Sequence, residues 1–305
     1  MTNTPSLTRP TSLKEWLERS KQVLRPVVAK STKHGLAYEA QPTDLFISPY
    51  AKCGTTWLQQ IVHGLRTHGS MEFDKIMQAI PRLEFAQWLE IDLYAPQAGN
   101  FKVFKCHYNY QEIPKGGRYI VSFRDPKDAL VSIYHFLNGH QWEAGLVSIS
   151  EFARVFYLKY QGNRWENSYW GHLVSWWEQR QNPKVLLLCY EAMKANLPGA
   201  VQAIAEFIGV EQDQSLLELV VKQASLDFML AHKSKFSPSM PEKAMEKIGF
   251  TPTSDTLVTV RTGRVGDHRA ELPDDIAAEM DAIWSETVKV RTGFSSYQTL
   301  CERLA

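Results

Sequence analysis

The segment that starts at Lys52 has residue types that suit the binding of an anion. Lys52 brings a full positive charge, Gly54 allows close approach of the backbone, and Thr55 and Thr56 bring hydroxyl groups. A short apolar run ends at Pro49 just before them. Apolar side chains then recur at helical spacing, at Leu58, Ile61, Val62 and Leu65. We therefore expect a strand, a tight loop and a helix whose unpaired first N–H groups attract phosphate or sulfate oxygens.

Three other apolar runs end beside side chains that can bind or react. The runs are Phe101–His107, Tyr119–Phe123 and Val185–Cys189, and the side chains are those of His107, Arg124 and Tyr190. Ligands bind beyond the carboxyl ends of parallel strands, so we expect these groups to meet the Lys52 loop at one edge of a sheet. An imidazole titrates near neutrality, which makes His107 the candidate general base.

Helical patterns between and around these strands supply the elements that must position the groups. Asp125 and Pro126 are suited to begin a helix directly after Arg124. Other helices are predicted over residues 11–30 with a break near Pro26, 152–160, 168–179, 201–208, 216–221 and 273–290. Strands that alternate with helices predict an α/β fold, with a central parallel β-sheet flanked by helices.

The domain organisation follows from the same patterns. We expect a single domain over residues 1–305, with an N-terminal helical extension over 1–30. Residues 232–258 hold several Pro, Ser, Thr and Lys residues without a clean period, and we interpret them as a candidate lid. The pair Trp176–Trp177 is assigned to the core.

Composition excludes several classes of function. The formal net charge of the 305 residues is +1, so there is no global field to attract nucleic acid. No stretch approaches the roughly 18 apolar residues of a membrane span, and we expect no membrane partner. The 4 cysteines have no metal-ligand or redox-pair spacing, which favours the reducing cytoplasm.

The Lys52 loop differs from the usual nucleotide triphosphate loop, in which Gly precedes Lys and Ser or Thr. It resembles the phosphosulfate-binding loop of the cytosolic sulfotransferase family, whose usual form is Tyr-Pro-Lys-Ser-Gly-Thr-Thr-Trp. Ala51 stands where the family has Pro, and Cys53 where it has Ser. Further matches are Arg124 to Asp128, Ser132 to Phe136, Trp176–Trp177, Tyr190 to Lys194 and Arg261 to Asp267, so the similarity covers about residues 40–270.

This resemblance implies a sulfuryl donor, 3′-phosphoadenosine 5′-phosphosulfate (PAPS), and a product, adenosine 3′,5′-diphosphate (PAP). It assigns the donor loop to Lys52, Cys53, Gly54, Thr55, Thr56 and Trp57. It assigns the surroundings of the 3′-phosphate to Arg124, Ser132, Arg261, Thr262 and Gly263, and other nucleotide contacts to Tyr190 and Ser225. Arginine guanidinium groups suit phosphate because they form paired, charge-assisted hydrogen bonds.

The implied reaction is in-line transfer of the sulfuryl group to an acceptor O–H or N–H. His107 removes the acceptor proton, Lys52 stabilises the leaving phosphate, and Lys105 neutralises the sulfuryl oxygens. This scheme requires no metal.

The acceptor-binding residues are predicted to be Arg82, Glu84, Phe85, His107 and Tyr134. Phenol-sulfating members of the family have an aromatic residue where Arg82 stands, so we expect a small, polar hydroxyl or amine acceptor instead of a plain phenol. Glu84 could meet a polar or cationic acceptor, or be a solvated charge. The stretch from Arg269 to Ala278 departs from the family's dimerisation motif, and both monomer and dimer stay open.

Two other classes of function remain as alternatives. One is a nucleotide kinase or NTPase with an atypical phosphate loop, although the Gly-Lys-Ser/Thr order and an obvious metal-binding carboxylate are missing from the sequence. The other is a non-catalytic nucleotide-binding protein, which the presence of both Lys105 and His107 disfavours.

Overall fold

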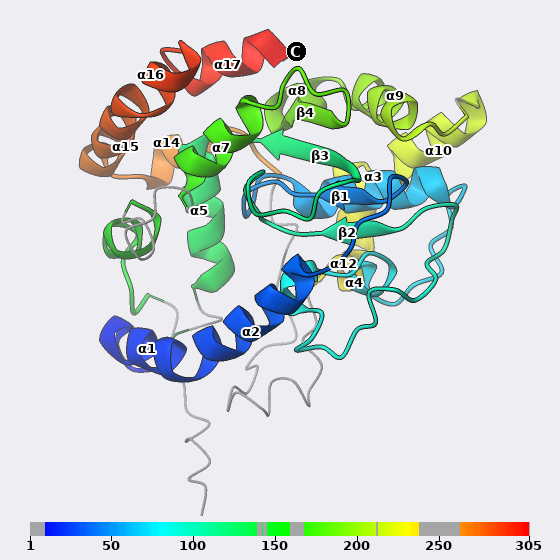
Figure 1. The fold of residues 1–305 in the computed structure, drawn as a ribbon. Helices are drawn as coiled ribbons and strands as arrows, with labels where there is room; N and C mark the ends of the chain where they lie inside the picture. The colour runs from blue at the N-terminus through cyan, green and yellow to red at the C-terminus, as the bar shows by residue number, and fades with distance from the viewer. Residues whose placement is uncertain are drawn as a thin grey trace, which may run out of the picture.

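The computed structural model describes residues 10–138, 142, 145–158, 168–211, 213–237 and 263–304. Within these residues, four strands form one parallel sheet in the order β2-β1-β3-β4 (Figure 1). They are β1 (Leu45–Ile47), β2 (Val103–Lys105), β3 (Arg118–Phe123) and β4 (Val185–Cys189). The predicted α/β fold is confirmed, and the carboxyl ends of all four strands lie at one edge.

Helices cover both faces of the sheet because the strands bury side chains on both sides. Leu45 and Ile47 pack on one face against α3 (Thr55–Arg66), α9 (Leu197–Ile208) and α10 (Gln214–Gln223). Phe46 points to the opposite face, which is covered by α5 (Pro126–Leu137), α7 (Tyr169–Trp177) and α15 (Asp274–Glu286). Trp176 and Trp177 are buried in that second layer, as predicted. The three layers give the site a rigid base.

The prediction of a helix broken near Pro26 is wrong. The chain is helical from α1 (Leu13–Arg19) through a π-helical turn (η1, Ser20–Leu24) into α2 (Arg25–Leu36). Proline lacks the N–H group needed inside a regular helix, but Pro26 follows the wider π-helical turn of η1, in which the N–H of Arg25 donates to the carbonyl oxygen of Ser20. The helical segment therefore passes residue 30 and ends at Leu36, before β1.

The prediction of a single helix over residues 273–290 is also wrong. The chain forms α15, then α16 (Val288–Thr292) and α17 (Tyr297–Leu304). Thr287 leaves the helical region of backbone space, with φ −120° and ψ −73°, and Gly293 ends α16 with φ +82°.

The other helical elements connect these layers. They are α4 (Ile76–Ala79), η2 (Leu83–Phe85), α6 (Ile149–Phe152), η3 (Ala153–Tyr157), α8 (Tyr190–Ala195), α11 (Leu226–Ala231), α12 (Lys233–Phe236) and α14 (His268–Glu271). The candidate lid begins at α12, and its residues from 238 to 258 lie outside the described part of the chain. In the part that the structure describes, no helix has both the length and the hydropathy to cross a membrane.

Candidate active site

The loop between β1 and α3 turns through two left-handed residues. Lys52 has φ +66° and Gly54 has φ +92°. A β-carbon at position 54 would lie 3.1 Å from Cδ2 of Tyr190 and 3.3 Å from Oγ of Ser122, so glycine satisfies both the conformation and the space. A positive φ is uncommon for a lysine, which makes Lys52 a conformationally restricted residue in this loop. The turn opens directly onto the N-terminus of α3, where free N–H groups favour anions.

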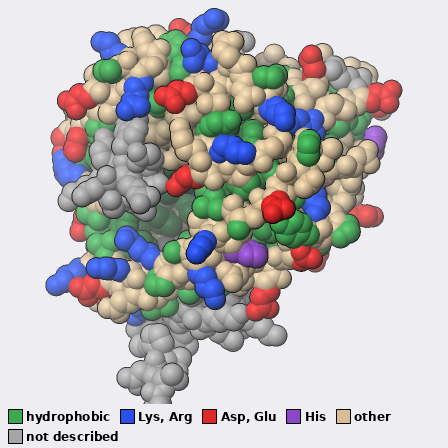
Figure 2. Space-filling model, viewed as in Figure 1, with side chains coloured by type: hydrophobic (Ala, Val, Ile, Leu, Met, Phe, Trp, Pro, Cys, Tyr) green, Lys and Arg blue, Asp and Glu red, His purple; other side chains and the backbone are tan. Residues whose placement is uncertain are grey.

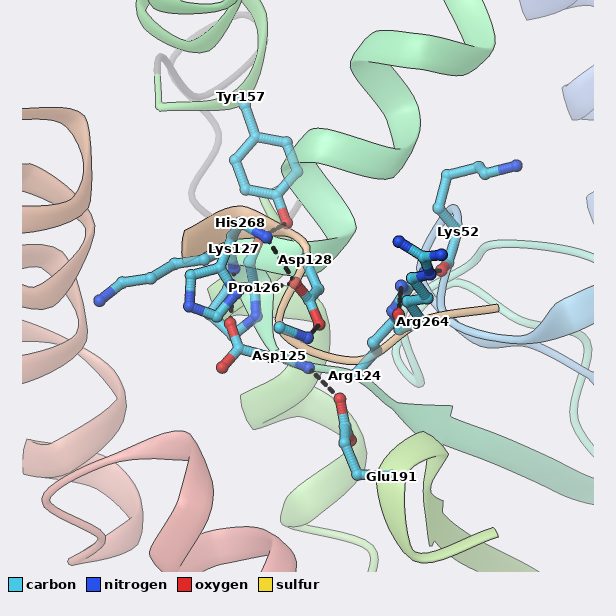
Figure 3. Close-up of polar contacts among 11 residues, drawn as sticks. Lys52, Arg124, Asp125, Pro126, Lys127, Asp128, Tyr157, Glu191, Arg264 and His268 are labelled. Carbon is cyan, nitrogen blue, oxygen red and sulfur yellow. Dashed lines mark hydrogen bonds and ion pairs between the residues drawn. The ribbon is translucent and has the colours of Figure 1, made fainter. Parts of the chain in front are cut away.

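Arg124 closes the other side of this loop. It donates from Nη1 to the carbonyl oxygen of Lys52 at 3.1 Å and from Nη2 to that of Arg264 at 3.2 Å (Figure 3). Its guanidinium carbon lies 4.6 Å from the ring centre of Tyr190. The Lys52 side chain lies over the ring of Phe136 at 4.4 Å. The predicted residues Lys52, Arg124 and Tyr190 are therefore brought together.

Two buried polar atoms in this region have no hydrogen-bond partner among the described residues. They are Oγ1 of Thr55 and Nε of Arg124. Burying a polar group without a partner is costly, so a ligand that accepts a hydrogen bond from either atom would remove part of that cost. A hydroxyl and a guanidinium N–H both donate to anionic oxygens, as do the first N–H groups of α3. The site thus fits a phosphate-like or sulfate-like group.

A buried carboxylate holds the segment after Gly263 against α5. Asp128 is 1% exposed. It accepts hydrogen bonds from the N–H of Gly266 at 2.7 Å, and from N–H and Nδ1 of His268 at 3.1 and 2.7 Å (Figure 3). Burial opposes ionisation, but these hydrogen bonds outweigh it and lower the pKa of Asp128. Asp128 belongs to a motif recognised in the sequence, yet its role was missed because both partners are far away in the chain.

The structure describes some of the other residues predicted to bind the nucleotide, and others lie outside the described part of the chain. Trp57 donates from Nε1 to the carbonyl oxygen of Ala224 at 2.8 Å, and its ring centre lies 5.3 Å from that of Tyr190. Ser225 caps α11 by accepting from the N–H of Phe228. Ser132 is partly buried on α5, and Gly263 begins the last described segment. Arg261 and Thr262 lie outside the described residues.

The side chain of Cys53 is buried in the core that lies under the loop. Burial raises the pKa of its thiol to about 12. Its N–H donates to Tyr50 and its carbonyl oxygen accepts from Ser122. Cys53 therefore shapes the loop as a small protonated residue, and its sulfur is not a reactive thiolate.

His107 lies beyond the end of β2, and a backbone carbonyl group fixes the tautomer of its ring. Its Nδ1 lies 2.7 Å from the carbonyl oxygen of Pro49. A carbonyl only accepts, so Nδ1 carries the hydrogen and Nε2 keeps the lone pair of the neutral ring. Burial, followed by the charges of Arg82 and Lys105, lowers the pKa of His107 well below 6.5. The ring is therefore neutral at pH 7 and able to accept a proton.

The neighbours of His107 form a compact charged group. The N–H of His107 donates to Oε1 of Glu84 at 2.6 Å, and Nε of Arg82 donates to Oε2 of the same carboxylate at 3.2 Å. The Arg82 guanidinium lies 4.0 Å from the ring centre of Phe85. Burial lowers the pKa of Lys105 to about 7, with Arg82 adding to this effect and Glu84 opposing it. Three of the predicted catalytic and acceptor residues, Arg82, Glu84 and Lys105, thus interact with His107, and Phe85 packs on Arg82.

Tyr134 is placed differently from that group. Its hydroxyl donates to the carbonyl oxygen of Val147 at 2.9 Å, and its ring centre lies 5.8 Å from that of Phe152.

Sequence reasoning missed His172, which is 1% exposed and has its Nε2 atom 3.0 Å from the carbonyl oxygen of Ser48. Burial lowers its pKa to about 3, so it supports the β1 loop as a neutral group.

The electrostatic character of the site is local. On the face seen in Figure 2, Lys and Arg side chains are interspersed with Asp and Glu side chains. Among the described residues, no cluster of three or more His, Cys, Asp or Glu has an arrangement that could hold a metal ion. The positive groups around the loop and His107 are therefore the features that can attract an anionic ligand.

Comparison with known proteins gives a consistent result. Residues 42–291 match the model of the sulfotransferase domain. Mouse sulfotransferase 1E1 is 26% identical over 260 residues, which cover 82% of this chain and 85% of the mouse protein. Cytosolic sulfotransferase 17 of Arabidopsis thaliana is 29% identical over 280 residues, which cover 85% of this chain and 78% of the plant protein.

Solved structures share the fold. Mouse sulfotransferase SULT7A1, complexed with PAP, matches with a TM-score of 0.63 at 21% identity, over 85% of this chain and 89% of the mouse chain. Retinol dehydratase, in complex with androsterone and the inactive cofactor PAP, matches with a TM-score of 0.70 at 17% identity, over 91% of this chain and 94% of that chain.

Proposed function

The chain belongs to the sulfotransferase domain family, and from this premise we propose that it transfers the sulfuryl group of PAPS to a hydroxyl or amine of a small polar molecule. The observation that carries the proposal is the meeting of the Lys52 loop with a neutral, oriented His107 at one edge of the sheet. The kinase alternative is not favoured, because the family match covers the phosphate loop itself.

The residues proposed to bind PAPS gather around the loop between β1 and α3. Lys52, Thr55 and the first N–H groups of α3 would hold the phosphosulfate, and Arg124 would hold the 3′-phosphate. When bound, PAPS supplies the sulfuryl group and a phosphate leaving group. The PAP complexes of mouse SULT7A1 and of retinol dehydratase, which have this fold, support the assignment.

His107 acts on the acceptor through Nε2. The Pro49 carbonyl oxygen holds Nδ1–H at 2.7 Å, so Nε2 is the nitrogen that takes the proton of the acceptor hydroxyl. A positioned base of this kind contributes about 10²- to 10⁴-fold in rate. Lys105 and Lys52 supply positive charge where negative charge grows.

For the setting of the reaction we keep the expectations drawn from the sequence. The protein acts on a small molecule in the cytoplasm, as a monomer or dimer, without nucleic acid or a membrane. The name of the Arabidopsis relative, cytosolic sulfotransferase 17, supports the location. Retinol dehydratase binds androsterone or retinol, but Arg82 gives this chain a more polar site than such ligands need.

A thermal shift experiment tests the donor. PAP at a hundred times its dissociation constant stabilises the folded protein by about 2.7 kcal/mol, and ATP with magnesium should not. Stabilisation by ATP with magnesium alone overturns the proposal.

A pair of histidine variants tests the base. His107→Ala should retain PAP stabilisation and lose at least about a hundredfold in turnover. His34→Ala, at an exposed position of α2, should change neither. Unchanged turnover in His107→Ala contradicts the role of His107.

A further inference from the structure

Arg82 lies on the side of the β1 loop opposite to the nucleotide residues. The N–H of Lys105 donates to the carbonyl oxygen of Pro81 at 2.9 Å, and the backbones of Arg82 and Lys105 form an isolated parallel β-bridge. β2 is the edge strand next to β1, whereas Arg124 and Tyr190 follow β3 and β4 on the other side of β1. The sheet order therefore separates the Arg82 group from the nucleotide side and places it on the acceptor side of His107.

Both carboxylate oxygens of Glu84 already accept hydrogen bonds inside the protein. One carboxylate oxygen accepts from the N–H of His107 at 2.6 Å and the other from Nε of Arg82 at 3.2 Å. Its side chain is 9% exposed. The carboxylate thus serves to position His107 and Arg82.

Arg82 has donors left over. Among the described residues its hydrogen bonding ends at Glu84, which takes Nε and leaves both terminal amino groups. The side chain is 23% exposed, and the ring of Phe85 packs on the guanidinium at 4.0 Å. A guanidinium held by an ion pair at one edge and by a ring on its face is oriented before a ligand arrives.

The local charge also favours an anion. In addition to burial, the charge of Arg82 lowers the pKa of both Lys105 and His107, and the neighbouring carboxylate of Glu84 opposes this effect on Lys105. The charge of an anionic group near Arg82 would offset the repulsion between Arg82 and Lys105.

We propose that the acceptor carries a carboxylate or phosphate group that binds the terminal amino groups of Arg82 while its hydroxyl reaches His107. This inference rests on the proposed function and narrows it to anionic acceptors. Both anions present two oxygens that a guanidinium can bind with a pair of parallel hydrogen bonds.

The test compares matched acceptors in the presence of PAPS. The pairs are 4-hydroxyphenylacetate with 4-hydroxyphenylacetamide, 4-hydroxybutyrate with 4-hydroxybutyramide, and glycerol 3-phosphate with glycerol. In the native protein, kcat/KM for the anion should exceed that for the neutral partner by about ten- to a hundredfold in at least one pair, as expected for a charge-assisted hydrogen bond. Which pair responds distinguishes carboxylate from phosphate.

Variants assign the preference to Arg82. In Arg82→Gln, the ratio of kcat/KM for the anion to kcat/KM for its neutral partner should fall to about one, and Arg82→Lys should retain part of the preference. Arg154→Gln is the control: Arg154 is in an exposed ion pair with Asp275, and its replacement should leave the ratio unchanged. The ratio cancels any general damage to His107, because the neutral partner reports that damage. A ratio near one in the native protein, turnover of no anionic member, or an unchanged ratio in Arg82→Gln overturns the inference.

A parallel thermal shift with PAP separates the two levels of the proposal. If PAP stabilises the protein and the anions have no advantage, only the inference about Arg82 fails. If PAP does not stabilise it, the donor assignment fails, and the inference with it.

Discussion

Replacing Asp128 with Asn should weaken both the fold and the nucleotide site. The carboxylate accepts hydrogen bonds from one N–H of Gly266 and two N–H groups of His268, at 2.7, 3.1 and 2.7 Å. It therefore holds residues 264–268, whose Arg264 carbonyl oxygen receives Nη2 of Arg124 at 3.2 Å. Loss of the carboxylate frees one of the two carbonyl anchors of the Arg124 guanidinium.

The size of the effect follows from the number of hydrogen bonds. An amide presents one oxygen and one NH₂ group, so Asp128→Asn keeps the bonds to His268 or the bond to Gly266, and its NH₂ then faces an N–H donor. A hydrogen bond to a charged group contributes about 1.5–3 kcal/mol, and a neutral one about 1 kcal/mol. After the lower desolvation cost of the amide is subtracted, the free energy of unfolding should fall by about 3 kcal/mol.

Urea denaturation and titration with PAP measure both consequences. The affinity for PAP should fall by about tenfold or more, because about 1.4 kcal/mol of lost binding corresponds to that factor. Asp281→Asn is the control, since Asp281 is 67% exposed in its pair with Lys127 and such surface pairs contribute less than about 1 kcal/mol. An Asp128→Asn protein that matches this control in stability and PAP affinity refutes the reasoning.

Three further predictions concern the base, the loop glycine and the loop cysteine. The pKa of His107 is lowered well below 6.5, and only the neutral ring accepts a proton. In a pH profile, kcat/KM should therefore decline with falling pH only below 6.5. A midpoint of this decline above 6.5 contradicts the assignment. Gly54→Ala should lose PAP affinity in calorimetry, since its φ is +92° and its β-carbon would meet neighbours, whereas Gly209→Ala, with φ +70° and nothing within 4 Å, should cost only about 1 kcal/mol of stability. Under native conditions at pH 8, iodoacetamide followed by mass spectrometry should label partly exposed Cys301 before buried Cys53, and the reverse order would show that the Cys53 sulfur is accessible.

Sequence reasoning located the strand ends, because these depend on local pattern. Each strand is a short apolar run, and the reactive residue follows it within a few positions, so Lys52, His107, Arg124 and Tyr190 were found without knowledge of the fold. The parallel topology then brings those positions to one edge. The error at Pro26 also has a local cause: the pattern marks Pro26 as a breaker, but a π-helical turn directly before it lets the helical run continue.

The hydrogen bonding of the candidate catalytic groups could not be predicted in this way. The tautomer of His107 depends on a carbonyl group 58 residues earlier, and its backbone is held by a carboxylate 23 residues earlier. Asp128 and its partner His268 are 140 positions apart. Periodicity reports which side chains are buried near one another along a single element, and contains no information on such pairs.

Arg82 shows how this difference changes a functional conclusion. From the sequence, Arg82 and Glu84 are two charges in one acceptor loop, and acidic residues there admit a cationic acceptor. In the folded chain the carboxylate is shared between Arg82 and the backbone of His107 and is only 9% exposed, whereas Arg82 is 23% exposed and keeps its terminal amino groups for a ligand. The sign of the expected acceptor charge is thus decided by which of the two side chains the fold engages, and it is decided in favour of an anion.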